Sequence, residues 1–261
     1  MVGAGKGLAA PVRAPLRPEL GLVDGLDLHA QYYQDRIGGD FFDAVRLGTR
    51  VAFLLCDIAG RRPEVDTIAS AMQEAFRAKA EELFGAGDAN LMEGTEVMVR
   101  EINLALIAAA KGVRFTPTMV GCYDAQFGLM AYVNAGGQTV LLHDSDGTRA
   151  LPNVAMPLGL FTHMTYDASM QAFEPGATLL VVTKGVTESM RGKTRFGPER
   201  VLEELERSKG ESASGVCKAV LTAAHDFEKR RRGWLRLGRK MVPEDMTALA
   251  MVRSGGPGGS K

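Results

Sequence analysis

The sequence has few of the features that accompany redox chemistry, secretion or a membrane span. Its three cysteines, Cys56, Cys122 and Cys217, are odd in number and lack metal-type spacing. We therefore interpret them as small buried apolar residues in a reducing compartment. The N-terminus has no hydrophobic signal region, and no apolar run approaches the roughly 20 residues that a membrane-spanning helix needs. We expect a cytoplasmic protein without a transmembrane segment.

The sequence also has no net charge. Its 31 lysines and arginines balance 31 aspartates and glutamates, which argues against nucleic acid or an acidic membrane as the partner of the whole surface. A local exception, residues 229–240, holds seven cations and the single tryptophan. This basic cluster could contact an acidic partner, an anionic lipid or nucleic acid, or it could be a solvated helix end and loop. We expect no specific nucleic acid.

The composition is that of an ordinary globular domain. It is 46% hydrophobic and 24% charged, and no repeat or compositional break divides it. Residues 1–17 and 254–261 are rich in small residues and proline and have no amphipathic face, so we predict flexible tails there. One domain is expected over residues 18–253.

Hydrophobic periodicity predicts the order of helices and strands. Strands are predicted at residues 26–30, 41–47, 51–56, 113–123, 128–133, 139–143, 168–173, 178–182 and 246–252. Helices are predicted at residues 63–83, 88–110, 198–207 and 214–229, and Pro63 is a favourable residue for a first helical turn. Clusters of strands separated by helix pairs indicate an α+β fold in which helices cover sheets.

Two aspartates lie at the ends of neighbouring strands in one predicted hairpin. Asp40 precedes the strand at 41–47, and Asp57 follows the strand at 51–56. A strand as apolar as the second usually delivers its terminal carboxylate to an edge where it is used, although two solvated strand-end aspartates are the alternative. We therefore expect Asp40 and Asp57 to lie together at one edge of a sheet.

A series of short motifs occurs in a fixed order along the chain. In that order they are Gly38-Gly39-Asp40-Phe41-Phe42-Asp43, Cys56-Asp57-Ile58-Ala59-Gly60, Phe115-Thr116-Pro117-Thr118, Tyr132-Val133-Asn134-Ala135-Gly136-Gly137, Met156-Pro157-Leu158-Gly159-Leu160, Glu174-Pro175-Gly176-Ala177-Thr178-Leu179-Leu180, Thr183-Lys184-Gly185-Val186-Thr187-Glu188, Phe196-Gly197 and Glu244-Asp245-Met246-Thr247. Together they resemble the SpoIIE-like branch of the metal-dependent PPM protein phosphatases, over roughly residues 18–253. The resemblance implies a four-layer αββα sandwich of two antiparallel sheets flanked by helix pairs.

The resemblance also implies a chemistry. In the family, two Mn²⁺ or Mg²⁺ ions hold a water or hydroxide that attacks the phosphorus of phosphoserine or phosphothreonine. Clustered carboxylates suit this role because hard divalent cations prefer oxygen ligands. The implied setting is bacterial signalling, and the implied partner is a phosphorylated signalling protein such as an anti-sigma-factor antagonist.

The family's ligand positions can be carried over to this chain. Asp40 matches the aspartate of the first motif, and Asp57 matches the aspartate that bridges the two ions. Ile58 would contribute its backbone carbonyl oxygen. Asp43, in the first motif, has two interpretations, a metal role or a pairing with a nearby arginine.

Two ligand positions depart from the family. Its third ligand, an aspartate in a Thr-Asp-Gly motif, is Lys184 here. Its Asp-Asp pair before the final strand is Glu244-Asp245, with Glu244 at the usual ligand position. An ammonium about 4 Å from a divalent ion, at an effective dielectric constant of about 20, is repelled by roughly 8 kcal/mol. We therefore expect at most one ion, or none.

Lys184 has two predicted placements. Its ammonium could act as a surrogate for the missing ion and pair with Asp57 and Glu244, because buried carboxylates need a counter-charge. Alternatively, the side chain turns to solvent and leaves the position empty.

Two functions follow from these residues. The chain is either an active phosphoserine and phosphothreonine phosphatase with an altered metal site, or a pseudophosphatase that binds a phospho-regulated partner without hydrolysis. The two changed ligand positions favour the pseudophosphatase. The presence of Asp40 and Asp57 supports the enzyme.

Overall fold

Two antiparallel sheets form the centre of the protein. A computed structural model describes residues 25–34, 38–60, 64–152, 155–229 and 244–255, and these residues contain two five-stranded sheets. In spatial order the first sheet consists of β1 (Leu26–Tyr32), β12 (Thr247–Arg253), β9 (Thr178–Val182), β6 (Thr139–Asp144) and β7 (Gly147–Ala150). The second consists of β2 (Asp40–Leu47), β3 (Arg50–Asp57), β4 (Thr118–Asp124), β5 (Leu129–Ala135) and β8 (Ser169–Ala172).

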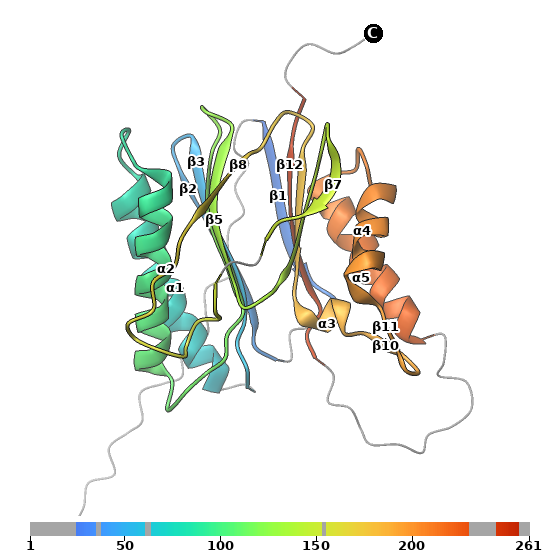
Figure 1. Ribbon diagram of the computed structural model, residues 1–261, viewed down its shortest axis with the longest axis horizontal. Helices are drawn as coiled ribbons and strands as arrows, with labels where there is room; N and C mark the ends of the chain where they lie inside the picture. The colour runs from blue at the N-terminus through green and yellow to red at the C-terminus, as the bar shows by residue number, and fades with distance from the viewer. Residues whose placement is uncertain (1–24, 35–37, 61–63, 153–154, 230–243, 256–261) are drawn as a thin grey trace, which may run out of the picture.

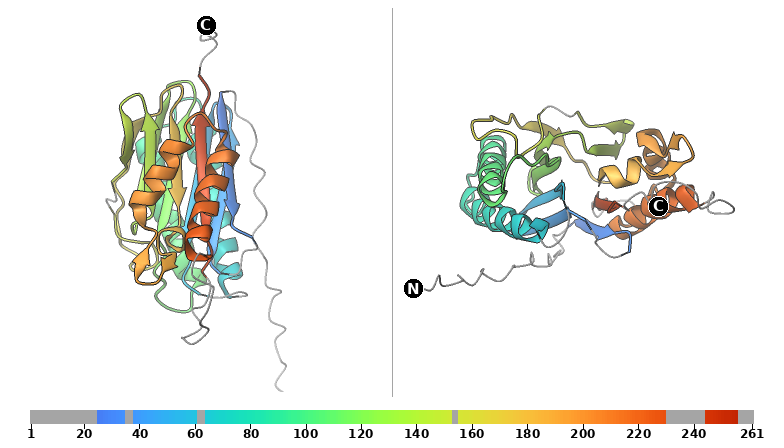
Figure 2. Two further views of the ribbon diagram at one scale, coloured as in Figure 1. Left: turned by 90° about the vertical axis from the view of Figure 1, so that its right-hand side faces the viewer. Right: turned by 90° about the horizontal axis from the view of Figure 1, so that it is seen from below.

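Helix pairs cover the outer faces of the two sheets. The pair α1 (Glu64–Phe84) and α2 (Leu91–Ala109) packs on the second sheet, and the pair α4 (Gly197–Arg207) and α5 (Ala213–Lys229) packs on the first. Figure 1 shows the four layers side by side, and the left view of Figure 2 shows α4 and α5 lying across the first sheet. The predicted sandwich of two antiparallel sheets between helix pairs is confirmed.

The link between β9 and α4 was not predicted from periodicity. It holds a short helix, α3 (Lys184–Thr187), and a small hairpin of β10 (Met190–Arg191) and β11 (Thr194–Arg195). Helix α3 lies at the lower end of the sandwich in Figure 1. This end carries the candidate site.

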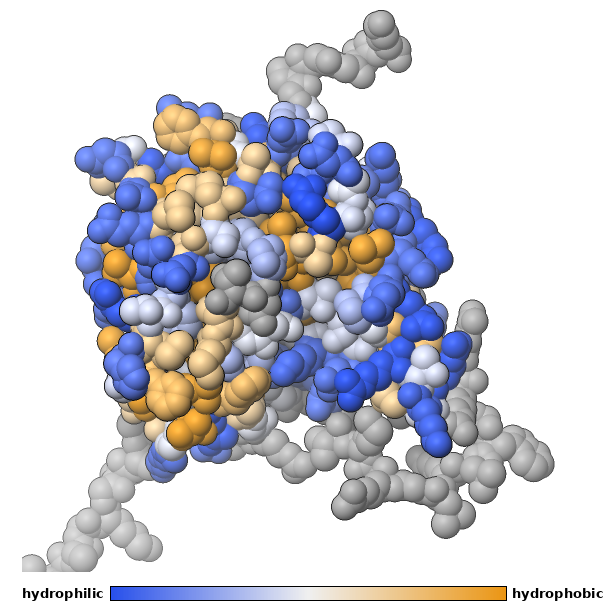
Figure 3. All heavy atoms as spheres, viewed as in Figure 1, coloured by the Kyte–Doolittle hydropathy of each residue, from blue (hydrophilic) through white to orange (hydrophobic). Residues whose placement is uncertain are grey.

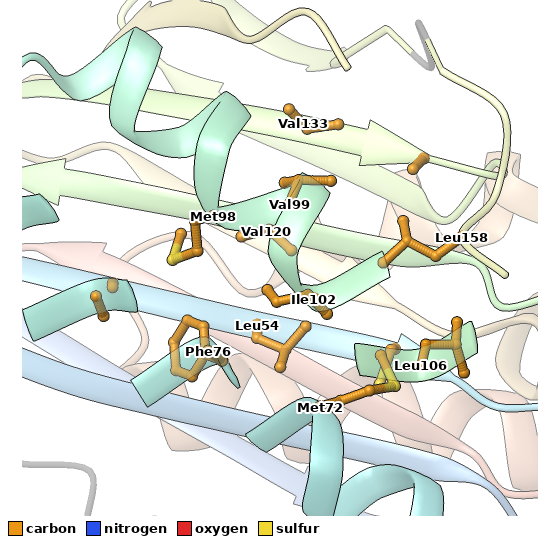
Figure 4. Close-up of a cluster of buried hydrophobic side chains, with 14 of the residues drawn as sticks. Leu54, Met72, Phe76, Met98, Val99, Ile102, Leu106, Val120, Val133 and Leu158 are labelled. Atoms are coloured by element: carbon orange, nitrogen blue, oxygen red, sulfur yellow. The ribbon is translucent and has the colours of Figure 1, made fainter. Parts of the chain in front are cut away.

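Alternation along β3 divides the hydrophobic core. Val51, Phe53 and Leu55 face the first sheet, whereas Ala52, Leu54 and Cys56 face α1 and α2. In Figure 4, Leu54 lies between Phe76 of α1 and residues of α2 such as Ile102. Fully burying a large apolar side chain stabilises the fold by about 1.5–3 kcal/mol. The same alternation decides which face each polar residue at the strand ends meets.

One predicted strand is shorter than expected. We predicted a strand at 113–123, but β4 begins at Thr118. Pro117 has no backbone N–H and cannot continue the ladder as a donor. The preceding residues pair elsewhere, since Thr116 and Leu158 exchange two backbone hydrogen bonds of 3.0 and 3.1 Å. Residues 112–117 therefore form a loop that is tied to residues 155–163.

Several sequence predictions fall outside the described residues. These are the N-terminal tail at 1–17, residues 256–261 of the C-terminal tail predicted at 254–261, Pro63, and residues 230–240 of the basic cluster. The domain limits of 18–253 remain a prediction. In the part of the chain that is described, none of the helices is long and apolar enough to cross a membrane.

Candidate functional site

The hairpin of β2 and β3 brings the two predicted aspartates together. Asp40 lies directly opposite Asp57 in the register of the two strands. Paired residues of an antiparallel ladder point to the same face. Leu55, two residues before Asp57, belongs to the cluster between the sheets, so both carboxylates point toward the first sheet. The pairing predicted from the sequence is confirmed.

Asp40 is a buried carboxylate held by the opposite sheet. The residue is 3% exposed, which rules out the alternative of a solvated strand end for Asp40. The hydroxyl of Thr183, at the end of β9, donates to Asp40 Oδ2 at 2.6 Å, and the hydroxyl of Thr247, at the start of β12, donates to the same oxygen. These two hydrogen bonds join the two sheets at the lower edge of the sandwich.

Asp57 ends β3 at the open end of the hairpin, and Ile58 follows it. The Asp57 amide donates to the Pro117 carbonyl at 2.9 Å, and the Ile58 amide donates to the Gly39 carbonyl at 3.1 Å. A Cβ on Gly39 would lie 1.7 Å from the Ile58 carbonyl oxygen. Gly39 is therefore required for the backbone to approach this closely.

The pKa of each of the two carboxyl groups lies above its ordinary value. Burial raises the pKa of Asp40 well above its ordinary value, and the charge of Asp57 acts in the same direction, against the threonine hydrogen bonds. Burial likewise raises the pKa of Asp57 to about 6, and the charge of Glu244 adds to this effect. The ammonium of Lys184 opposes it. The pair therefore retains protons at pH values where isolated aspartates are ionised.

Lys184 takes a position between its two predicted placements. It begins α3 and is partly buried, and its Nζ lies over the ring of Phe115 at 4.9 Å from the ring centroid. Among the described residues, no carboxylate oxygen lies within 4.0 Å of that ammonium. Its charge still acts on Asp57, whose pKa it lowers. Lys184 thus supplies positive charge near the aspartates without a direct ion pair to a described residue.

The two acidic residues before β12 have different environments. Glu244 is exposed, whereas Asp245 is buried. Both carboxylate oxygens of Asp245 accept the Gly38 amide at 2.9 Å, and Oδ2 also accepts the Asp40 amide at 3.3 Å. Asp245 therefore fixes the backbone that leads into β2.

Asp43 has the second of its two predicted interpretations. It lies three residues after Asp40, so it points to the opposite face of β2, toward α1. Arg77 donates to it through Nε at 2.7 Å and Nη2 at 3.0 Å, and Gln73 donates at 3.0 Å. The pairing with an arginine is confirmed, and Asp43 lies on the far side of the strand from the other aspartates.

The chemistry of these atoms tests how well the site fits two divalent cations. Oxygen donors are present in Asp57 and in the Ile58 carbonyl, but an ammonium stands at the third ligand position. The oxygens of Asp245 already accept backbone amides. In the described ranges, no three His, Cys, Asp or Glu side chains are grouped so that they could hold a metal ion. The residues present do not fit the family's two-ion arrangement.

Three residues of the site were not singled out from the sequence. Thr183 and Thr247 hold Asp40, and Phe115 underlies Lys184. All three belong to recognised motifs, and Thr183 and Thr247 lie within two residues of a ligand position. For the two threonines that adjacency was the available signal, because a residue beside a ligand at a strand end is placed to orient it; the sequence holds no such signal for Phe115.

The comparisons with known proteins agree with this fold. The family model described as "Stage II sporulation protein E (SpoIIE)" matches residues 48–253. The Synechocystis protein IcfG is 25% identical over 193 residues, which cover 65% of this chain and 30% of IcfG. The chain therefore spans less than a third of that curated relative.

Two solved structures illustrate the shared fold. The RsbU and RsbW domains of Rv1364c from Mycobacterium tuberculosis superpose with a TM-score of 0.69 at 23% identity, covering 94% of this chain and 62% of that one. RsbX in complex with magnesium superposes with a TM-score of 0.59 at 13% identity, covering 88% and 96%. At these identities the likeness shows the fold.

Proposed function

The chain belongs to the SpoIIE family, a branch of the PPM-type phosphatase domains, and we propose that it is a pseudophosphatase of bacterial signalling. In this proposal it binds a phospho-regulated protein partner and does not hydrolyse the phosphate ester. An anti-sigma-factor antagonist is the class of partner that the resemblance suggests. The likeness to a chain that carries RsbU and RsbW domains supports this class.

The position of Lys184 is the observation that carries the proposal. Lys184 stands at the third ligand position of the chain, its ammonium lies over Phe115, and its charge lowers the pKa of Asp57. A divalent cation about 4 Å away would be repelled by roughly 8 kcal/mol at an effective dielectric constant of about 20. Even half of that repulsion reduces metal affinity by nearly three decades at about 1.4 kcal/mol per decade.

The hydrogen bonding of the other acidic residues supports the same conclusion. Asp40 accepts two threonine hydroxyls, and Asp245 accepts backbone amides. Both carboxylates therefore have structural roles that need no ion. Glu244 is exposed and could reach the edge, but it would meet the ammonium of Lys184 there.

An active phosphatase with an altered metal site is the second candidate. It is favoured by the intact hairpin, in which Asp57 and the Ile58 carbonyl remain beside each other. When bound, a metal ion would supply charge neutralisation and an activated water. RsbX, which shares the fold, was solved in complex with magnesium. We rank this candidate second because only half of the ligand positions are unchanged.

Restoring the third ligand tests the proposal. We expect Mn²⁺ calorimetry to detect no tight site in the native chain and a site at least tenfold tighter in Lys184→Asp, strongest in the double variant with Glu244→Asp. Mn²⁺ should raise the Tm of these variants and leave that of the native chain unchanged. Hydrolysis of a phosphoserine peptide should appear only in the variants that bind metal.

Lys209→Asp is the matched control for this experiment. It makes the same change of charge at an exposed position after α4, far from the aspartates. It should leave metal binding and hydrolysis at the level of the native chain. Tight binding of two ions and turnover of the phosphoserine peptide by the native chain would overturn the pseudophosphatase proposal and establish the second candidate.

A further inference from the structure

Two loops next to the candidate site form one continuous surface. Backbone hydrogen bonds tie residues 112–116 to residues 156–163: the Arg114 amide donates to the Gly159 carbonyl at 3.3 Å, and Thr116 and Leu158 exchange two bonds. Gly159 has a φ of 88°, and a Cβ there would lie 1.9 Å from the Arg114 carbonyl oxygen. The two loops therefore keep a fixed relation to each other. We call their outer face the paired-loop surface.

The paired-loop surface exposes large apolar side chains. Val113 is 73% exposed, Met156 is 50% exposed, and Phe115 and Phe161 are each 47% exposed. Figure 3 shows hydrophobic residues gathered at the lower left, over the end of α2 and the loops beside it in Figure 1. Contiguous apolar surface of this kind marks an interaction site more often than isolated exposed residues do.

The surface is hollowed as well as apolar. A pocket of about 450 Å³ lies beside it, lined by Ile107, Val113, Leu160, Phe161 and His163 among others. A concave apolar pocket of this size accepts one large side chain of a ligand. A flat or convex loop tip would be expected if the apolar residues served to enter a bilayer. The shape therefore favours a polypeptide over a membrane.

The paired-loop surface carries positive charge beside its apolar residues. Residues 107–117 and 155–166 contain Lys111, Arg114 and His163 and no aspartate or glutamate. Arg114 already pairs with Glu64, whereas Lys111 is exposed at the rim. Lys184 adds a further cation at the inner border through its contact with Phe115. An acidic group would therefore be stabilised around the apolar pocket.

We infer that the paired-loop surface docks an acidic, apolar segment of a protein partner. One large apolar side chain of that segment enters the pocket beside Phe161, and flanking carboxylates face Lys111 and Lys184. The inference rests on the proposed function, from which it takes the existence of a protein partner. It adds where the partner binds and which chemistry is recognised. The contact between Phe115 and Lys184 makes this surface continuous with the aspartate edge.

Selection from random peptides tests the docking site and does not require the partner to be identified. The full native chain, immobilised in buffer with a metal chelator, is presented with a phage-displayed library of random twelve-residue peptides. We expect the enriched peptides to combine Leu, Phe or Trp with Asp or Glu. Their recovery should fall at least tenfold on the double variant Val113→Ser and Phe161→Ser. Lys111→Glu should remove the preference for acidic residues.

Phe127→Ser is the matched control. Phe127 is 63% exposed in the turn between β4 and β5, at the opposite end of the sandwich, so this variant should recover peptides as the native chain does. Circular dichroism and thermal unfolding of each variant show whether it is folded. No enrichment, or enrichment that does not depend on Val113 and Phe161, would overturn the inference.

Two further measurements distinguish protein docking from membrane binding and from the pseudophosphatase proposal. Vesicles of phosphatidylserine and phosphatidylcholine are sedimented with the native chain. Binding that is lost in the serine double variant, without any peptide enrichment, would assign the surface to a membrane and refute protein docking. Native metal binding and hydrolysis, with Phe161-dependent peptide selection, would refute the pseudophosphatase and leave the docking site standing. If the native chain enriches no peptides and also binds no metal and hydrolyses no phosphoserine peptide, only the docking site is refuted.

Discussion

The two halves of the candidate site are built differently. In the half formed by β2 and β3, Asp40 is buried, hydrogen-bonded and opposite Asp57 in a regular ladder. In the half formed by the end of β9 and the start of β12, Lys184 rests on Phe115 and Glu244 is exposed. The first half is part of the core, and the second lies at its rim.

The second half also divides within itself. Each of its ligand positions has a neighbour in sequence that is buried: Thr183 beside Lys184, and Asp245 beside Glu244. The buried neighbours bond to Asp40 or to the backbone before it. The difference teaches that the scaffold of the site and its ligand chemistry are carried by separate residues, so the chemistry can differ while the scaffold stays.

The largest expected effect comes from closing the backbone approach in the first half. Gly39→Ala would place a Cβ 1.7 Å from the Ile58 carbonyl oxygen, which forces the hairpin end to move. We expect a loss of about 3 kcal/mol or more in the free energy of unfolding. Chemical denaturation measures it. Gly87→Ala, which meets nothing within 4 Å, is the control and should change stability by less than about 1 kcal/mol.

If Gly39→Ala were as mild as Gly87→Ala, the first half would not be the rigid part of the site. The half formed by β2 and β3 would then be no more rigid than the half formed by β9 and β12.

An intermediate effect is expected from the protonation of Asp57. Its pKa is raised to about 6 from 3.8, so the folded state holds the proton more tightly than the unfolded state. The stability that this gives is complete below about pH 4 and is lost as the pH rises through 6. Above pH 7 the ionised carboxylate costs up to about 3 kcal/mol, and about 1–2 kcal/mol after allowance for its partial exposure.

Asp57→Asn removes this cost. We therefore expect the variant to be more stable than the native chain at pH 7.5 and equal to it near pH 4, in denaturation curves measured at both values. The exposed Asp167→Asn should show no such difference. A variant that is less stable than the native chain at pH 7.5 would mean that the charge of Asp57 is already neutralised in the fold.

The smallest effect is expected in the second half. Phe115→Leu removes the ring beneath the ammonium of Lys184, a contact worth about 0.5–1 kcal/mol at a partly exposed site. Chemical denaturation should show a loss of about that size in the free energy of unfolding. Phe127→Leu, in the turn at the opposite end, is the control for replacing an exposed ring. A loss above about 2 kcal/mol would show that the rim is held as firmly as the core half.

Much of the fold could be predicted because short-range patterns specify it. β9 was predicted at 178–182 and has these bounds, and the hairpin that pairs Asp40 with Asp57 was predicted from two apolar runs. Helix α2 begins one residue after Asn90, whose side chain accepts the Glu93 amide at 3.2 Å and caps the helix. These features depend on neighbours in the sequence.

The contacts across the sandwich could not be read in the same way. Thr247 is 207 residues from Asp40, and no local pattern says that its hydroxyl bonds that carboxylate. Lys184 was placed in the correct region by the motif, but its rotamer depends on the ring of Phe115, which comes from another loop. Periodicity gives the face of a strand, and tertiary packing decides which side chain lies opposite.

Strand β2 has a mechanical consequence for the whole sandwich. The attraction between apolar layers has no preferred direction, whereas hydrogen bonds fix direction as well as distance. On one face of β2, Asp43 is fastened to α1 through Arg77, and on the other face Asp40 is fastened to the first sheet. β2 therefore fixes the relative positions of three of the four layers, the α1–α2 pair and the two sheets. Two carboxylates three residues apart, Asp40 and Asp43, make the hydrogen bonds that do so.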